Sequence, residues 1–155
     1  MRRPRPSLHR RSRPPHTAGP EPATGGSVTP DQLADRLEAA AARVGPAVER
    51  HVEHAATLGA ARIRANASGR PGPNVITGAY RASWRTTSRS IPHGATCTIG
   101  TRAPQGRRLE FGFVGPDSLG RVYNQPPFPH VGPAIPAIEA ALHAGMGDAV
   151  REVLF

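Results

Sequence analysis

The stretch TPDQLADRLEAAAARVGPAVERHVEHAATLGAARIRANAS, residues 29–68, decides the fold, because it has the pattern of one long amphipathic helix. Thr29 can cap the helix, Pro30 suits its first position, and Gln32 can reach back to complete a capping box. Apolar side chains then recur at three- and four-residue steps. They form one stripe, at Leu33, Leu37, Ala41, Val44, Val48, Val52 and Ala55, with Ile63 on the last turns.

Two signals limit this helix. Gly45-Pro46 lies in its interior, and proline removes a backbone donor and crowds the preceding turn, so we expect a kink or a break there. Ser68-Gly69 is a stop signal, and the turn-rich loop Arg70-Pro71-Gly72-Pro73-Asn74 follows it.

The next stretch has the period of two that is typical of strands. Tyr80, Ala82 and Trp84 alternate with polar residues, and Ile91-Pro92-His93-Gly94 can form a turn into the β-branched run Ala95–Ile99. This pattern predicts a hairpin. A third strand is expected at Arg108–Val114, with Leu109, Phe111 and Phe113 on one face as core residues.

The last stretch of the chain again has helical spacing. Ile135, Ile138, Leu142, Met146, Val150 and Val153 repeat to the end, with Gly145 and Gly147 weakening the middle. The fold class is therefore α+β, and we assign residues 29–155 to a single domain. We expect a long N-terminal helix, a small antiparallel sheet of three to four strands, and a C-terminal helix packed on the sheet.

Residues 1–28 form an arm that is rich in arginine and proline. The arm has too few apolar side chains to offset the entropy cost of ordering it, so we expect it to be disordered. All 20 basic residues of the chain are arginine, which indicates a GC-rich genome, and the formal net charge is +9. The arm can contact DNA phosphates or be a basic terminus without a specific partner. It can also precede the true start, if translation begins near Val28. Its candidate DNA contacts are Arg2, Arg3, Arg5, Arg10, Arg11 and Arg13.

Cys97 is the only cysteine, so no disulfide can form within the chain, which suits a reducing compartment. No apolar run is long enough to span a membrane, and the basic arm lacks the apolar middle section of a secretory signal. We expect the chain in the cytoplasm before it is assembled.

Chemical sites are sparse in the sequence. No phosphate-binding loop, nucleophile elbow or carboxylate pair stands out, so we expect no catalytic residue, no cofactor and no small-molecule substrate. His51 and His54 share a helix face but lack an evident third ligand, and we interpret them as solvated polar residues. Cys97 is interpreted as a small buried apolar side chain rather than a nucleophile.

Three short segments in the second half carry a resemblance. They are Thr77-Gly78-Ala79-Tyr80-Arg81-Ala82-Ser83, Leu109-Glu110-Phe111-Gly112, and Pro126-Pro127-Phe128 leading into Gly132-Pro133-Ala134. In this order, between a long first helix and a closing helix, the chain resembles the HK-ninety-seven gene-product-ten-like phage morphogenesis family. Tyr80 stands where that family usually has leucine, and Phe113 where it often has threonine.

The resemblance implies a function. Members of that family lie between the capsid and the tail of long-tailed double-stranded DNA phages, as connector, neck or tail-completion proteins. A virion protein is thus expected, forming a homo-oligomeric ring of six copies that contacts portal-side and tail proteins. The competing hypothesis is a small basic nucleic-acid-binding protein that uses the arginine arm.

The resemblance makes subunit-interface candidates of Thr77, Gly78, Tyr80, Arg81, Ser83, Glu110, Phe111, Gly112, Pro127, Phe128 and Pro133. Their own chemistry gives further expectations. Gly78 can supply a positive φ for a sharp turn into the strand, and Glu110 reads as a solvated or subunit-facing charge. Phe128 can contact a neighbour across an extended proline-rich path, or cover the chain's own core.

Overall fold

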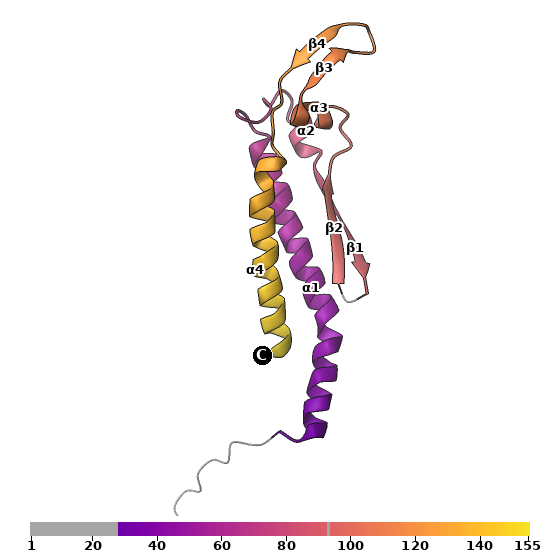
Figure 1. The fold of residues 1–155 in the computed structure, drawn as a ribbon, viewed down its shortest axis with the longest axis vertical. Helices are drawn as coiled ribbons and strands as arrows, with labels where there is room; N and C mark the ends of the chain where they lie inside the picture. Colours follow the sequence, from indigo (N-terminus) through magenta and orange to yellow (C-terminus); the bar gives the residue numbers. More distant parts are fainter. Residues whose placement is uncertain (1–27, 93) are drawn as a thin grey trace, which may run out of the picture.

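The computed structural model describes residues 28–92 and 94–155, and these form an α+β fold, as predicted (Figure 1). Two long helices lie side by side, with one β-hairpin along them and a second beyond one end of the pair. In chain order the elements are α1 (Pro30–Asn66), α2 (Ala79–Ala82), β1 (Arg85–Ile91), β2 (Gly94–Gly100), α3 (Gly106–Phe111), β3 (Phe113–Pro116), β4 (Val122–Gln125), the 3-10 helix η1 (Gly132–Ala134) and α4 (Ile135–Leu154).

Helix α1 begins where the capping pattern predicts. The Gln32 backbone N–H donates to the Thr29 hydroxyl at 3.3 Å, and the Thr29 N–H donates to the Gln32 side-chain oxygen at 3.2 Å. The helix is not broken at Pro46, so a break there is wrong. Ala47, the next residue, is buried in the contact with α4, and this packing holds the helix together where proline has removed one backbone hydrogen bond.

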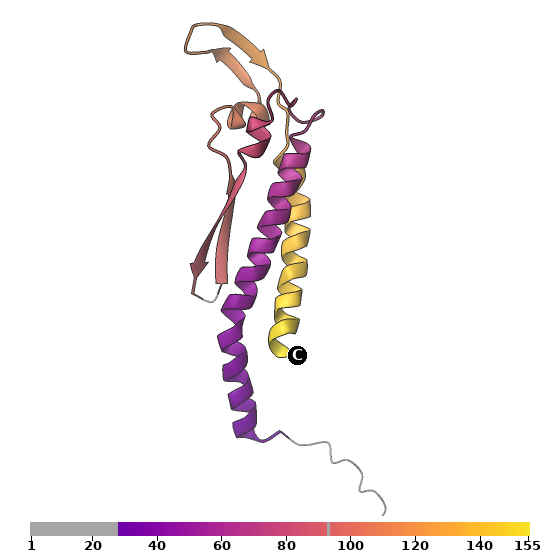
Figure 2. The same cartoon turned by 180° about the vertical axis from the view of Figure 1, so that it is seen from behind.

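Helix α4 packs along α1 and not on the sheet, which corrects the predicted packing. Helix α1 lies between α4 and the β1–β2 hairpin (Figures 1 and 2). Gly59 makes this close approach possible, because a Cβ atom there would lie 2.7 Å from Ile138 Cγ1 and 2.8 Å from Ile99 Cδ1. The glycine thus lets side chains from both neighbours meet over the surface of α1.

The core consists of two clusters along α1. The first joins the middle of α1 to the last turns of α4, through Ala40, Ala47, Ala149 and Val153, with Val48 packed against it. The second lies at the other end of the helix pair and contains Ile63, Trp84 and Ala134, with Tyr80, Ile99, Val131 and Ile138 around them. The predicted apolar stripe is core only in part, since Leu33, Leu37 and Val44 are exposed.

The predicted hairpin forms, with β1 and β2 antiparallel from Arg85 opposite Gly100 to Ile91 opposite Gly94. Its first strand begins later than predicted, because Ala79–Ala82 is the short helix α2. Tyr80 and Trp84 contact each other four residues apart, a spacing that suits a helical turn as well as strand alternation.

A single sheet of three to four strands is wrong, because the strands form two separate two-stranded sheets. Residues 106–111 are helix α3, which ends at Gly112 with φ at +77°, and β3 begins only at Phe113. Phe111 is 76% exposed and does not share a core face with Leu109 and Phe113. The β3–β4 hairpin then projects beyond the helix pair (Figure 1).

Two glycine substitutions test this packing with opposite expected signs. Gly59→Ala should lower the free energy of unfolding by about 1–2 kcal/mol, because the crowding of Ile138 and Ile99 outweighs the gain in helix propensity. Gly147→Ala in α4 should raise it by about 0.5–1 kcal/mol, because the new Cβ meets nothing closer than the Arg151 guanidinium at 3.7 Å. Urea denaturation measures both; a stabilised Gly59→Ala protein would contradict the packing.

Candidate functional site

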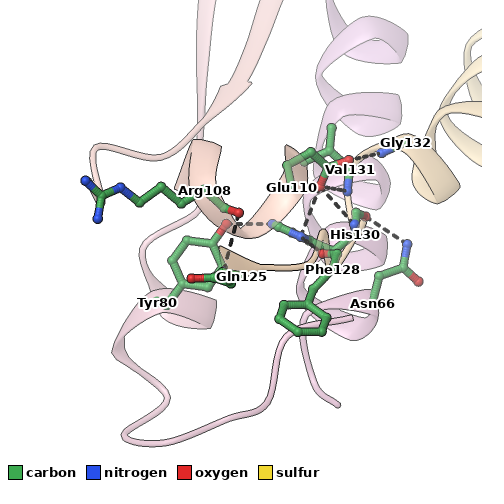
Figure 3. A network of polar contacts seen from close by, with 9 residues as sticks. All are labelled: Asn66, Tyr80, Arg108, Glu110, Gln125, Phe128, His130, Val131 and Gly132. Carbon is green, nitrogen blue, oxygen red and sulfur yellow. Dashed lines mark hydrogen bonds and ion pairs between the residues drawn. The ribbon is translucent and has the colours of Figure 1, made fainter. Parts of the chain in front are cut away.

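The three segments that carry the resemblance meet at one end of the helix pair (Figure 3). Tyr80 comes from α2, Glu110 from α3, and His130 from the extended segment before α4. Together with Asn66 at the end of α1 and the Phe128 backbone, they form what we call the Glu110–His130 network. This network is the most densely connected polar site in the part of the chain that the structure describes.

The carboxylate of Glu110, which belongs to α3, accepts three backbone hydrogen bonds from residues 130–132, where η1 begins. Its Oε2 accepts from the N–H groups of His130 at 2.9 Å and Val131 at 3.0 Å, and its Oε1 accepts from Gly132 at 2.9 Å. Burial acts to raise the pKa of Glu110, but these N–H groups and the nearby His130 hold the pKa below its ordinary value of 4.5. The carboxylate is thus an anionic cap at the start of η1, and it joins α3 to the segment that leads into α4.

His130 is fully buried, and its contacts define its tautomer. Nδ1 lies 2.9 Å from the Phe128 carbonyl oxygen and 3.0 Å from Glu110 Oε2, and neither of these atoms can donate a proton when Glu110 is ionised. Nδ1 therefore carries the hydrogen. In the neutral imidazole, Nε2, which lies 2.6 Å from the Tyr80 hydroxyl, then accepts a hydrogen bond from that hydroxyl.

Backbone contacts extend the network into neighbouring segments. Asn66 Nδ2 donates to the His130 carbonyl at 3.0 Å, which ties the end of α1 to the segment before α4. The Phe128 N–H donates to the Leu109 carbonyl at 2.7 Å, and Gln125 Nε2 donates to the Arg108 carbonyl at 3.4 Å. These bonds hold residues 125–130 beside α3.

Aromatic rings enclose the network on its inner side. Tyr80, Trp84 and His130 contact one another edge to face, with ring centroids 5.5 to 6.2 Å apart. The Trp84 indole nitrogen is buried and has no hydrogen-bond partner among the described residues. The imidazole therefore lies in an apolar position that excludes water, where its hydrogen bonds are stronger than they would be in water.

The order Tyr80, His130, Glu110 resembles a nucleophile, base and acid, but the geometry is unsuited to that chemistry. Burial raises the pKa of the Tyr80 hydroxyl to about 12, which opposes its ionisation. Glu110 directs its oxygens to three backbone N–H groups of its own chain. The arrangement favours holding chain segments together over activating a nucleophile.

A cavity of about 400 Å³ adjoins Tyr80. It is open, and its lining is largely apolar, with Ala67, Val75, Ile76 and Leu109 among the lining residues. Ile76 is almost fully exposed. The cavity walls come from the loop after α1 and from α2 and α3, so the same polar network supports their positions.

The remaining predicted residues of the first segment shape α2. Gly78 has φ at +76°, which confirms its positive φ, although it precedes a helix and not a strand. The Thr77 hydroxyl accepts from the Ala79 N–H at 3.3 Å, and the Ser83 hydroxyl donates to the Tyr80 carbonyl at 2.7 Å. Arg81 donates to the Ser68 hydroxyl at 3.3 Å. All four therefore serve local structure.

Some residues of the other two segments make close contacts within the chain, and others are exposed. A Cβ at Gly112 would lie 2.9 Å from the Gln125 carbonyl oxygen and 3.0 Å from the Pro127 nitrogen, so only glycine fits there. Phe128 is half-buried, with the Arg70 guanidinium 3.9 Å from its ring centroid. Phe111 and Pro133 are exposed.

The network corrects one sequence interpretation and adds two residues. Glu110 is not a solvated charge, since its side chain is 12% exposed and bonded within its own chain. His130 and Asn66 were missed. Neither lies in a periodic pattern, and only the position of His130 directly before the last helix could have pointed to a role there.

Other candidates lie apart from the network. His51 contacts Glu152 at 3.6 Å while His54 is exposed, and the described residues hold no group of three or more possible metal ligands. Cys97 is half-buried, with its sulfur 3.7 Å from the Ser88 hydroxyl, so it is less buried than predicted. Arg2, Arg3, Arg5, Arg10, Arg11, Arg13 and His93 lie outside the described residues.

No helix within residues 28–92 and 94–155 is long and apolar enough to cross a membrane. Comparisons of the chain with protein-family models, with curated proteins and with solved structures find no match.

Glu110→Gln should lower the free energy of unfolding at pH 7 by about 2–3 kcal/mol, because an amide is uncharged and directs its NH2 group against backbone donors. The folded-state pKa of Glu110 is depressed, so its stabilisation is present above pH 4.5 and is lost as the pH falls toward the folded-state pKa. The wild-type protein should therefore lose more stability than Glu110→Gln over that acidic range.

Denaturation curves at a series of pH values measure this difference. Glu53→Gln is the matched control, because Glu53 is exposed on α1, and it should leave both stability and its pH dependence nearly unchanged. Equal pH dependence in wild type and Glu110→Gln would show that the carboxylate does not act as the anionic cap.

Proposed function

We propose that this chain is a structural subunit of the head-to-tail connector of a long-tailed double-stranded DNA phage. Copies assemble into a closed ring, with six as the expected number, in the neck or at the tail end of the virion. The protein acts by assembly, without catalysis or a cofactor. It lies in the host cytoplasm before assembly, and its partners are itself and the neighbouring neck, portal-side and tail proteins.

The observation that carries the proposal is the exposure of apolar side chains at both ends of an elongated protomer. At one end they belong to the first turns of α1 and the last turns of α4; at the other they belong to the loop after α1, to α3 and to the β3–β4 hairpin. Surfaces of this kind mark contacts with other protein subunits. The exposed residues are Leu33, Leu37, Val150 and Leu154 at the first end, and Ile76, Phe111, Val114, Leu119 and Val122 at the second.

The β3–β4 hairpin supports the same reading. A two-stranded hairpin that belongs to no larger sheet is marginally stable in water, and Val114 and Val122 are largely exposed on it. Its turn is nonetheless well defined, because Asp117 accepts from the N–H groups of Leu119 at 2.9 Å and Arg121 at 3.0 Å. A structured apolar projection of this kind suits contact with an adjacent subunit.

The Glu110–His130 network supports the proposal because it joins the segments that carry the resemblance to the phage family. The segments that resemble the phage morphogenesis family are distant in sequence, and in the fold they converge at the base of the projecting hairpin. The network anchors α3 directly before β3, and residues 125–130 directly after β4. A rigid base would let the hairpin transmit contacts between subunits.

Disruption of this gene alone should leave DNA-filled heads and separate tails in a lysate, seen by electron microscopy, because the joining layer is missing. Overlong tails would instead identify a subunit that terminates tail polymerisation. Complementation from a plasmid is the control. Normal infectious virions from the disrupted strain would contradict the connector proposal.

Deletion of residues 1–27 separates this proposal from the nucleic-acid-binding alternative. A connector subunit lacking the arm should still enter virions, measured by mass spectrometry of purified particles. The alternative instead requires that the deletion abolish binding to duplex DNA, with affinity in the full chain falling steeply as salt rises. If the deletion abolished virion incorporation, the prediction that the described domain is enough for a connector subunit to enter the virion would be wrong.

A further inference from the structure

The charges of the described domain are unevenly distributed along the chain. Residues 54–109 contain nine arginines and no acidic residue, whereas the ten acidic residues of the stretch 28–155 all lie before or after this part. None of the nine arginines makes an ion pair with a described residue. Within the described chain, this concentration of positive charge is therefore uncompensated.

The β1–β2 hairpin presents part of this charge on the side of α1 that faces away from α4 (Figures 1 and 2). Ile99 of β2 packs in the core beside α1, and Thr86 is its partner on β1. Because side chains alternate along a strand, the neighbours of these two residues lie on the opposite face, which we call the outer face. The polar members of the outer face are all exposed, and they are Arg85, Thr87 and Arg89 of β1 and Thr96 and Thr98 of β2.

An open hollow of about 580 Å³ continues the outer face at the base of the hairpin. Arg102, which follows β2, lines it together with Arg85 and several residues that carry hydroxyl groups. Arg85 also donates to the carbonyls of Ala82 and Trp84, but these groups are neutral and leave its charge uncompensated. Guanidinium groups beside hydroxyl donors are the side chains that bind phosphate oxygens.

We propose that the outer face and this hollow bind the phosphate backbone of duplex DNA. Arg85 and Arg89 are four residues apart on β1, which is about 13 Å at the rise of a strand and close to the width of about 12 Å of the major groove. The two guanidinium groups can therefore reach phosphates on both sides of that groove. The inference goes beyond the connector proposal and does not depend on it or on the arginine arm.

The composition of the outer face favours duplex DNA over other acidic partners. Proteins hold single-stranded nucleic acid with aromatic side chains that stack on the bases, and no aromatic residue lies among the described residues of this face. Interfaces between proteins centre on aromatic and apolar side chains. Among the described residues of the outer face, only Ile91 is a large apolar one, and it lies at the end of β1, away from the hollow.

The salt dependence of DNA binding tests the inference. Binding of the full chain to a fluorescent duplex is measured by anisotropy at a series of salt concentrations, and the logarithm of the binding constant is plotted against the logarithm of the salt concentration. The variant Arg89→Gln/Arg102→Gln should reduce the steepness of this plot by about 2, because each phosphate contact contributes about 0.9. Both side chains are exposed, so their replacement should leave the fold intact, which circular dichroism checks.

Two further variants serve as controls. Arg36→Gln/Arg151→Gln removes the same charge from exposed positions on α1 and α4, and it should keep the salt dependence of the wild type. Arg89→Lys/Arg102→Lys retains the charge of the outer face and should also keep it. The arginine arm is present in every protein, so its contribution cancels in the comparison.

Several results would overturn the inference. One is a wild-type chain that does not bind the duplex, and another is equal salt dependence in the wild type and Arg89→Gln/Arg102→Gln. Loss of salt dependence in the lysine variant as well would show that the fold and not the charge had changed. If sedimentation velocity without DNA showed salt-sensitive self-association that only the glutamine variant of Arg89 and Arg102 lost, while DNA binding was unchanged, the outer face would contact another copy of the chain instead.

Discussion

The Glu110 carboxylate is the constraint on which the rest of the structure depends. One side chain from a helix of six residues accepts hydrogen bonds from the backbone N–H groups of residues 130, 131 and 132, and so holds α3 against the segment that leads through η1 into α4. His130 and Tyr80 extend this constraint to α2, and Asn66 extends it to the end of α1. Because these groups lie against buried aromatic rings, leaving any of them unpaired would cost more than the same loss in water.

This concentration of polar contacts at one end leaves the other end open. Along the helix pair, packing depends on small residues, since Ala40, Ala47, Gly59 and Ala149 let the backbones approach closely. The larger apolar residues Leu33 and Leu37 lie outside that contact. A chain that buries alanines within itself and exposes leucines at its end has the distribution expected of a subunit whose remaining burial comes from its neighbours.

Several elements could be read from the sequence because their signals are local. The capping box at Thr29, the second strand of the first hairpin and the last helix all formed where pattern and turn chemistry placed them, whereas the first strand of that hairpin begins later than its pattern predicted. The short helices α2 and α3 were missed because they have only four and six residues. Over so short a stretch, residues four apart lie on the same face of a helix and of a strand, so their spacing does not distinguish the two structures. Pro46 was overestimated as a breaker because packing against α4 compensates for one lost bond.

The sequence by itself determined the α+β class, the long capped helix and the three segments worth attention, since each depends on neighbours within a few residues along the chain. Only the tertiary structure decided that α4 packs on α1, that the strands form two sheets, and that Glu110 is an internal cap. These facts depend on contacts such as Glu110 with Gly132 or Gly59 with Ile138, between residues far apart in sequence. No local sequence pattern predicts such a contact, because the contact depends on how whole helices and strands pack around the shared core.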